Sequence, residues 1–189
     1  MPNIHFDWLA RWYDRAIRPS EKEPLHRLLQ LPIAGLMLEV GGGTGRVSFP
    51  LCDQVGGLVV CDLSLPMLRQ AQVKGCLLTV QGRVEHLPFP DAHFERVLVV
   101  DAFHHFPDQP AAIPELVRVL EPGGILVIEE PDIRQFGVKM IALMETVALM
   151  GSRFRPPAEM AAMFSSAGLP AQWLADDQGG AWVYGVKPG

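Results

Sequence analysis

A short apolar run that ends in a cluster of glycines constrains this chain more than any other feature. Residues 36–40 read Leu-Met-Leu-Glu-Val, with Glu39 as the only acid, and the next five residues include four glycines, Gly41, Gly42, Gly43 and Gly45. Glycine lets the backbone turn sharply and lets a ligand approach where side chains would block it. Strand, glycine turn and helix is the arrangement of a nucleotide-type cofactor site at the carboxyl edge of a parallel sheet.

The glycine spacing argues against a dinucleotide. A dinucleotide site requires G-x-G-x-x-G, in which the third glycine allows close packing of helix on strand. Counted from Gly41, that third position is Arg46. A nicotinamide-dependent oxidoreductase is therefore a distant alternative for this chain.

Strand-like and helix-like segments alternate along most of the sequence, which predicts an α/β fold with a parallel sheet. The expected strands are residues 36–40, 58–61, 76–80, 96–100 and 125–129, followed by an antiparallel hairpin of 171–174 and 181–186. The expected helices between them are residues 46–54, 65–74 and 111–120, and Pro50 should distort the first of these.

Length and composition predict one domain over residues 1–189, with 49% hydrophobic residues to fill its core. The net charge of -5 disfavours nucleic acid as a partner, because phosphate-rich partners favour a basic surface. The longest apolar stretch, residues 141–150, is too short to span a membrane. The first seven residues lack the basic and apolar regions of a signal peptide.

The three cysteines, Cys52, Cys61 and Cys76, form no C-x-x-C pair, so no zinc site and no other metal site is expected. Cys61 and Cys76 lie in apolar, strand-like runs and are predicted to be core thiols. An odd number of cysteines without pairing is typical of a reducing compartment, which predicts a cytoplasmic location.

Asp62 stands at the end of the second expected strand. An acid about twenty residues beyond the glycine loop can accept both ribose hydroxyls of a nucleotide-type cofactor. It can also serve as a helix N-cap, as can Ser64. If Asp62 binds ribose, Leu63 and Met67 offer apolar contact beside the base.

The pattern acid-x-G-x-G-x-G, with Glu39 as the acid, resembles the first motif of the class I S-adenosylmethionine (SAM) dependent methyltransferases. The resemblance implies that the glycine loop passes under the methionine part of SAM, that Glu39 helps to hold the loop and the amino group, and that Asp62 binds the ribose. It also implies a Rossmann-like, doubly wound, seven-stranded sheet of order 3-2-1-4-5-7-6, with helices on both faces and a small helical cap.

Residues 82–91, Gly-Arg-Val-Glu-His-Leu-Pro-Phe-Pro-Asp, resemble the family segment that contacts adenine. Arg83 occupies the place of the acid that accepts the adenine amino group, and arginine has no acceptor. Either backbone groups around Val84 hold the adenine, or Arg83 turns to solvent.

Residues 99–108 resemble the family segment where the methyl group meets the acceptor, so Asp101 and Ala102 should lie near the methionine end of SAM. His104 and His105 follow. Either imidazole could take a proton from the acceptor or could steady the loop, and His104 is the first choice because it is nearer the strand. The acids at the end of the fifth strand, Glu129, Glu130 and Asp132, could line the substrate side, but at least two of them are expected in a solvated loop.

The amino-terminal segment resembles the helix that closes over SAM in small-molecule methyltransferases, including quinone-biosynthesis types. Residues 1–31 are thus expected to form a helical lid with Tyr13 near the cofactor, although simple packing on the sheet is the alternative. Residues 132–168 are expected to form a helical segment that lines the substrate side. The methionine stripe in that segment could equally be core or a homodimer contact.

These features together predict a SAM-dependent methyltransferase that acts in-line on a small, apolar or aromatic acceptor. The main alternative is a SAM-binding sensor or scaffold without catalysis. SAM as donor of some other group is a more distant one.

Overall fold

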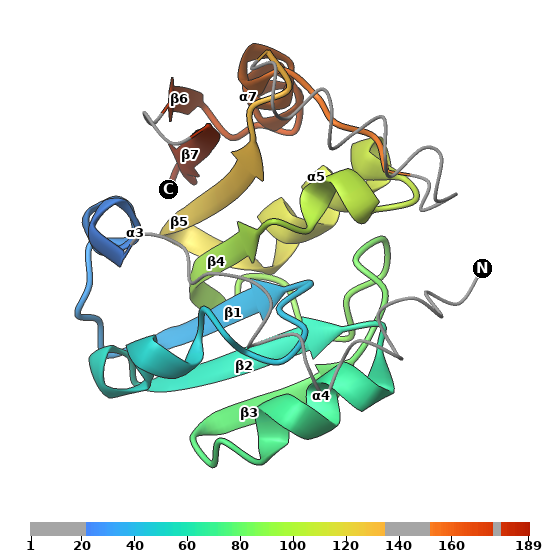
Figure 1. The fold of residues 1–189 in the computed structure, drawn as a ribbon. Coiled ribbons are helices and arrows are strands. Elements are labelled where there is room, and N and C mark those ends of the chain that lie inside the picture. The colour runs from blue at the N-terminus through green and yellow to red at the C-terminus, as the bar shows by residue number, and fades with distance from the viewer. Residues whose placement is uncertain (1–21, 135–151, 176–178) are drawn as a thin grey trace.

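The computed structural model describes residues 22–134, 152–175 and 179–189 of the chain. Its strands form one seven-stranded sheet of order β3-β2-β1-β4-β5-β7-β6 (Figure 1). The strands are β1 (Leu36–Val40), β2 (Gly57–Asp62), β3 (Leu77–Gln81), β4 (Phe94–Val100), β5 (Leu120–Pro131), β6 (Ala171–Ala175) and β7 (Gly180–Val186). The first five strands are parallel, and β7 pairs antiparallel with both β5 and β6. The predicted strand order and the terminal hairpin are confirmed.

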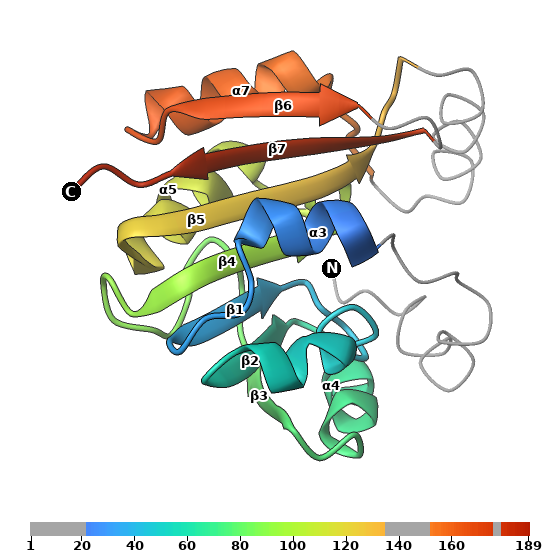
Figure 2. The ribbon, with the colours of Figure 1, turned by 90° about the vertical axis from the view of Figure 1, so that its left-hand side faces the viewer.

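Helices cover both faces of the sheet (Figure 2). One face carries α3 (Lys22–Leu29), the short 3-10 helix η1 (Phe49–Gln54) and α4 (Leu65–Gln72), and the other carries α5 (Gln109–Val119) and α7 (Pro157–Ser166). Central strands are buried on both faces, so neighbouring residues serve different layers: Leu38 packs under α5 and α7, and Met37 under α3 and η1. The doubly wound architecture is confirmed.

The helix expected after the glycine loop is shorter than predicted. Residues 49–54 form a 3-10 helix with Pro50 in its first turn, and the chain before it runs in turns. Proline lacks the N–H that a longer α-helix would need at this point, so the predicted helix cannot extend back to residue 46.

The cysteine prediction was wrong. Cys52 and Cys76 form a disulfide, with their Cα atoms 6.2 Å apart, and Cys76 lies exposed at the surface instead of in the core. Cys61 is a buried free thiol, as expected. Spacing along the chain could not reveal the bridge, because β2 and α4 fold back and bring the start of β3 beside η1.

Several expectations fall outside the described residues. Most of the expected lid, with Tyr13, and residues 135–151 of the expected substrate-side segment lie there. The described end of the first region is α3, whose residues Leu25, Leu28 and Leu29 pack on the sheet in one cluster with Trp182. None of the described helices is long and apolar enough to cross a membrane.

Candidate cofactor and acceptor site

The glycine loop after β1 has a backbone that side chains would distort. Gly41, Gly43 and Gly45 have φ values of +72°, +52° and +68°, in the left-handed region that favours glycine. The Gly41 N–H donates to the Cys61 carbonyl at 2.7 Å, which ties the loop to β2. A Cβ atom on Gly41 would lie 2.7 Å from the Ala102 Cβ, so the loop also touches the end of β4.

Glu39 lies beneath this loop and is 1% exposed. Its carboxyl group accepts a hydrogen bond from the Ser48 hydroxyl, which fastens the far end of the loop to β1. A Cβ atom on Gly42 would meet the Glu39 Oε2 atom at 2.7 Å, so the carboxyl group supports the loop from below. Burial raises the pKa of Glu39 to about 7, against the smaller lowering effect of the Ser48 hydrogen bond.

Asp62 is held at the carboxyl end of β2 by two backbone donors. Its Oδ2 atom accepts from the Gly43 N–H at 2.8 Å, and its Oδ1 atom accepts from the Ser64 N–H at 2.7 Å. The N-cap of α4 is Ser64, whose hydroxyl accepts from the Met67 N–H at 3.3 Å. The two readings of Asp62 are therefore separated: Ser64 caps the helix, and Asp62 faces the glycine loop.

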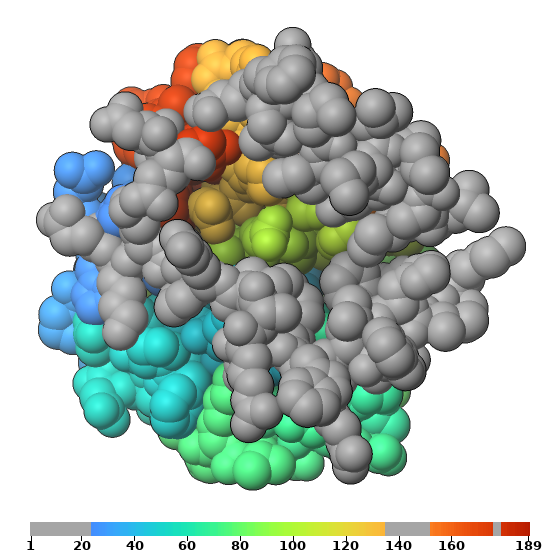
Figure 3. Space-filling view, viewed as in Figure 1, coloured from blue at the N-terminus to red at the C-terminus, as the bar shows by residue number. Residues whose placement is uncertain are grey.

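The glycine loop, Asp62 and the ends of β3 and β4 enclose one cavity along the carboxyl edge of the sheet. Figure 3 views this edge; at its centre the described atoms run from green near the bottom to yellow near the top. The cavity is lined by the predicted residues Glu39, Gly41, Gly42, Gly43, Asp62, Leu63, Met67, Arg83, Val84, Asp101, Ala102 and His105, together with Ser64, Glu85, Phe106 and Pro107 among others.

Two details of this lining matter for a ligand. A Cβ atom on Gly43 would project toward Asp62 Oδ2 and Met67 Sδ, 3.9 and 4.0 Å away, and so would occupy space between the loop and the acid. Asp101 is held at the end of β4 with a φ of +51°, an unusual backbone for a non-glycine residue and one that recurs at functional sites. Gly45 is not part of the lining: it packs against Leu77 of β3.

The loop after β3 determines which way the Arg83 side chain points. The Arg83 side chain is 57% exposed, and its Nε atom lies 3.4 Å from Oε2 of Glu85, whose side chain is only 10% exposed. Val84, which stands between these two residues in the sequence, is buried. Arg83 thus reaches outward, and the acid that lines this end of the cavity is Glu85.

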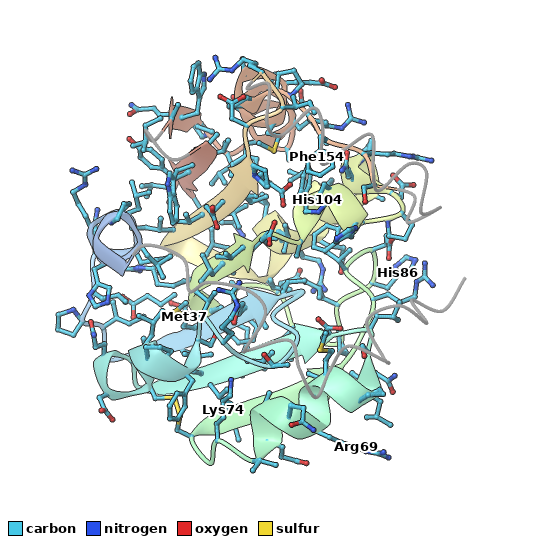
Figure 4. All side chains as sticks on the ribbon, in the orientation of Figure 1. Met37, Arg69, Lys74, His86, His104 and Phe154 are labelled. Atoms are coloured by element: carbon cyan, nitrogen blue, oxygen red, sulfur yellow. A yellow bond between two sulfur atoms is a disulfide. The ribbon has the colours of Figure 1, made fainter. Side chains whose placement is uncertain are left out.

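His104 is buried and lies outside the cavity lining. It is 3% exposed, its Nδ1 atom lies 2.7 Å from Glu130 Oε2, and its ring stacks on Phe154 with centroids 4.3 Å apart (Figure 4). A carboxylate only accepts hydrogen bonds, so Nδ1 is the donor. Glu130 also accepts from the Phe103 N–H at 2.7 Å. These contacts hold the His104 ring in place inside the protein, which indicates a structural role.

The expectation that at least two of the acids Glu129, Glu130 and Asp132 lie in a solvated loop was wrong: Glu129 and Glu130 belong to β5, and Asp132 follows it directly. Glu130 and Asp132 are 2% and 3% exposed. Each is buried because it has a specific partner: Glu130 holds His104, and Asp132 accepts hydrogen bonds from Arg134. The continuous apolar run of a strand buried on both faces could have pointed to Glu130, since residues 124–128 before it are all buried.

His105 is the histidine that lines the cavity. It follows His104 in the 3-10 turn η2 (Phe103–His105), and its Nδ1 atom lies 3.1 Å from the Ser152 hydroxyl. Burial, with a smaller effect of the neighbouring His104, lowers the pKa of His105 to about 3. The ring is therefore neutral near pH 7.

Comparison with known proteins agrees with this geometry. Residues 38–128 match the family model described as a methyltransferase domain. Over 104 residues, the chain is 33% identical to the ubiquinone/menaquinone biosynthesis C-methyltransferase UbiE of Francisella philomiragia, a match that covers 50% of this chain and 42% of the relative. The chain thus spans less than half the length of this curated relative.

Solved structures share the fold over nearly the whole chain. A chain in the complex between the Haloferax volcanii Trm112 methyltransferase activator and a methyltransferase superposes with a TM-score of 0.80 at 20% identity, covering 97% of this chain and 98% of that one. A SAM-dependent methyltransferase of Thermotoga maritima, described as a possible histamine N-methyltransferase, gives 0.74 at 24% identity, with 96% and 98% covered.

The motif order, the sheet and these matches point to one class of protein. Residues 38–128, just under half of the chain, match a methyltransferase domain. The chain is similar in sequence to the quinone-biosynthesis C-methyltransferases, and it shares its fold with solved SAM-dependent methyltransferases.

Proposed function

We propose that this chain binds SAM and transfers its methyl group in-line to a small, apolar or aromatic acceptor. The observation that carries the proposal is the anchored Asp62 carboxylate, which two backbone N–H groups orient beside the glycine loop. That is the position from which an acid can accept the two ribose hydroxyls of a nucleoside. The space beside Gly43, which a side chain would fill, fits a ligand that runs along the loop.

The strand order indicates where the amino-acid end and the base of SAM would lie. With ribose at Asp62 on β2, the amino-acid end would lie over the loop after β1, toward Asp101 and Ala102 on β4. The base would lie toward β3, between Leu63 and Met67 on one side and Val84 on the other. When bound, SAM supplies an electrophilic methyl group on a sulfonium. The protein's part is to align the acceptor with that group, and such positioning can lower a barrier by about 7–11 kcal/mol.

The acceptor side of the cavity supports an aromatic or apolar acceptor. Phe106 and Pro107 line the cavity beside Ala102. The similar UbiE protein is named for C-methylation in ubiquinone and menaquinone biosynthesis, which makes a hydroxylated aromatic ring the first class of acceptor to test. Residues 1–31 as a lid, residues 132–168 as the opposite wall, a homodimer and a cytoplasmic location stay predictions.

We assign to His105, in place of His104, the role of base toward the acceptor. Its neutral ring lies in the cavity and can accept a hydrogen bond from an acceptor hydroxyl. A base with so low a pKa is weak, but methyl transfer places positive charge on the acceptor and makes its proton strongly acidic. His105 would therefore orient the hydroxyl first and take the proton late, as the methyl–sulfur bond breaks and the bond from methyl to acceptor forms.

Calorimetric titration with SAM, with NADH in parallel, tests the cofactor assignment. We expect the wild type to bind SAM and not NADH. Asp62→Ala should weaken SAM binding by about 10- to 100-fold, since a hydrogen bond to a charged group contributes about 1.5–3 kcal/mol. Asp53→Ala is the matched control, because Asp53 is an exposed acid outside the cavity lining.

Two results would overturn the proposal. The first is a folded protein that takes up no SAM. The second is an Asp62→Ala variant that binds SAM as tightly as Asp53→Ala does. A protein that binds SAM yet forms S-adenosylhomocysteine with none of a panel of hydroxylated aromatics would favour the sensor alternative.

A further inference from the structure

We propose that Ser152 positions His105 for its part in methyl transfer. The Ser152 hydroxyl oxygen accepts the Nδ1–H of the imidazole, which makes Nε2 the ring atom that accepts a hydrogen bond from the acceptor molecule. This inference rests on the proposed function, in which His105 is the base toward the acceptor. Ser152 acts through His105, so it is a positioning residue and not a catalytic one.

Ser152 and His105 meet although they are 47 positions apart in the sequence. The Ser152 Oγ atom lies 3.1 Å from the His105 Nδ1 atom, in a partly buried contact. His105 lines the cavity, whereas Ser152 is not among the described residues that line it. The serine therefore contacts the ring and not the space that a ligand would occupy, so an effect of Ser152 on the reaction has to pass through His105.

The backbone next to Ser152 is fixed against η2 and α5. The Arg153 N–H donates to the His104 carbonyl oxygen at 2.7 Å. Gln109 is 1% exposed, and its Nε2 atom donates to the carbonyl oxygen of Arg153 at 2.8 Å and to that of Phe103 at 2.9 Å. Both polar backbone groups of Arg153 are thus bound to η2 or α5, which keeps Ser152 beside the turn that carries the two histidines.

Two side chains strengthen the same attachment. The Phe154 ring stacks on the His104 ring, with centroids 4.3 Å apart and planes inclined by 13° (Figure 4). The Arg155 Nε atom donates to Gln109 Oε1, which leaves the Nε2 atom of the same amide to donate to the two carbonyl oxygens. The position of the Ser152 hydroxyl is therefore set by a packed segment and not by one contact alone.

The direction of the hydrogen bond decides what His105 can do. Burial lowers the pKa of His105 to about 3, so the ring is neutral near pH 7, with one N–H donor and one acceptor nitrogen. If the Ser152 hydroxyl donates to Nδ1, the ring proton is on Nε2, which then cannot take another. If the hydroxyl accepts from Nδ1–H, the lone pair lies on Nε2. Only the second arrangement suits a base, because the hydrogen bond at one ring nitrogen sets the protonation of the other.

The contact also persists when the proton moves. In the proposed transfer, an electron pair of the acceptor forms the new bond to the methyl carbon, and the pair of the methyl–sulfur bond stays on sulfur. The hydroxyl proton of the acceptor passes to Nε2, which gives an imidazolium with two N–H donors. Ser152 still accepts from Nδ1–H and does not have to reorient, and a hydrogen bond from a charged donor is stronger than one from a neutral donor.

Nitrogen NMR of the whole chain tests the direction of this hydrogen bond. Protonated and unprotonated imidazole nitrogens have well-separated chemical shifts, so proton–nitrogen correlation spectra of isotope-labelled protein show which nitrogen carries the proton. The His105 signals are those that disappear in His105→Asn. We expect the proton on Nδ1 in the wild type near pH 7. In Ser152→Ala it should shift toward Nε2, which is the tautomer that histidine prefers in water, and Ser152→Thr should keep it on Nδ1.

Kinetics test whether this tautomer matters for the reaction. With 1,4-naphthohydroquinone as the acceptor probe under anaerobic conditions, Ser152→Ala should lower kcat by about 3- to 10-fold, as for the loss of one neutral hydrogen bond, and should keep the SAM affinity within about 3-fold of wild type. Ser152→Thr should restore kcat, because it keeps the hydroxyl. Ser165→Ala is the matched control, since Ser165 is an exposed serine of α7 whose hydroxyl donates to the Ala161 carbonyl.

A wild-type His105 ring with its proton on Nε2 overturns this inference, and that spectrum depends on no serine variant. A Ser152→Ala protein whose tautomer or kcat matches that of Ser165→Ala overturns it as well. Failure of the proposed function is a different result, in which the wild type takes up no SAM, and the spectra then still decide the direction of the hydrogen bond.

Discussion

At the scale of single residues, burial acts on two titratable groups of the site and disfavours the charged form of each. Glu39 has its pKa raised to about 7 beneath the glycine loop, and His105 has its pKa lowered to about 3 in the cavity. The charged form of each group loses hydration on burial, so the acid holds its proton and the base gives it up. Each therefore links stability to pH in an opposite direction.

Replacing Glu39 with glutamine should remove one pH dependence of stability. In the unfolded chain Glu39 releases its proton near its ordinary pKa of 4.5, whereas the folded protein keeps it until about pH 7. The unfolded state thus binds fewer protons between these values, and the free energy of unfolding falls as pH rises through them, by up to about 3 kcal/mol. Urea unfolding of wild type and Glu39→Gln from pH 5 to 8 measures the effect.

The expected result is a stability difference between Glu39→Gln and wild type that shifts in favour of the variant as pH rises toward 7. Glutamine keeps an acceptor for the Ser48 hydroxyl, so that hydrogen bond is not the variable. Asp53→Asn, an exposed substitution, should give a curve parallel to the wild type. If Glu39→Gln also runs parallel to the wild type at every pH, Glu39 is ionised in the fold and the pKa assignment is wrong.

We expect His105 to contribute to methyl transfer and not to SAM binding. With 1,4-naphthohydroquinone and related hydroxylated aromatics as acceptor probes under anaerobic conditions, His105→Asn should slow methyl transfer by about 100-fold or more. Its SAM affinity should stay within about 3-fold of wild type. Product analysis gives the rate and calorimetry gives the affinity. The exposed His93→Asn is the control, and an unchanged rate in His105→Asn would remove His105 from the mechanism.

At the scale of elements, the site depends on how the segments after β1 and β2 are tied together. Ser64 caps α4, and Asp62 bridges the start of α4 to the glycine loop. The Cys52–Cys76 disulfide joins η1 to the start of β3 and so encloses β2 and α4 in one covalent loop. β2 and α4, which both supply cavity-lining residues, are thereby enclosed in one covalent loop, and Asp62 links them to the glycine loop.

Removing this disulfide should destabilise the protein. The bridged cysteines are 24 residues apart, and closing a loop of that size in the unfolded chain corresponds to about 3 kcal/mol. Urea unfolding with and without dithiothreitol measures the change. A double variant, Cys52→Ala with Cys76→Ala, should be destabilised similarly and should no longer respond to dithiothreitol. Coincident wild-type curves in the two conditions would show that the bridge does not form in solution.

At the scale of the whole molecule, the cavity lies where the chain reverses its direction of travel across the sheet. From β1 the chain moves outward through β2 to β3 and then crosses back to β4 on the other side of β1. The connections leave β1 and β4 in opposite directions, which opens a crevice at their carboxyl ends. Loops from four strands line this one crevice, so a single extended ligand can touch residues more than sixty positions apart, from Glu39 to His105.

The sequence by itself determined the parts of the protein that depend on local chemistry. The glycine loop after residue 40, the acid at the end of β2 and the strand positions could all be predicted, because glycine torsions, strand burial and turn residues act over a few neighbouring positions. The strand order came from the family resemblance, since periodicity along a chain does not say which strands are neighbours.

Only the tertiary structure decided which side chains meet in the site. His104 and His105 are adjacent in sequence, but successive residues in a 3-10 turn point about 120° apart, so only His105 faces the cavity. The bridge between Cys52 and Cys76, the burial of Glu130 against His104, and the outward position of Arg83 beside Glu85 all depend on folded loops that bring these residues together. Direction and contact are properties of packing in three dimensions, and residue type and spacing alone do not specify them.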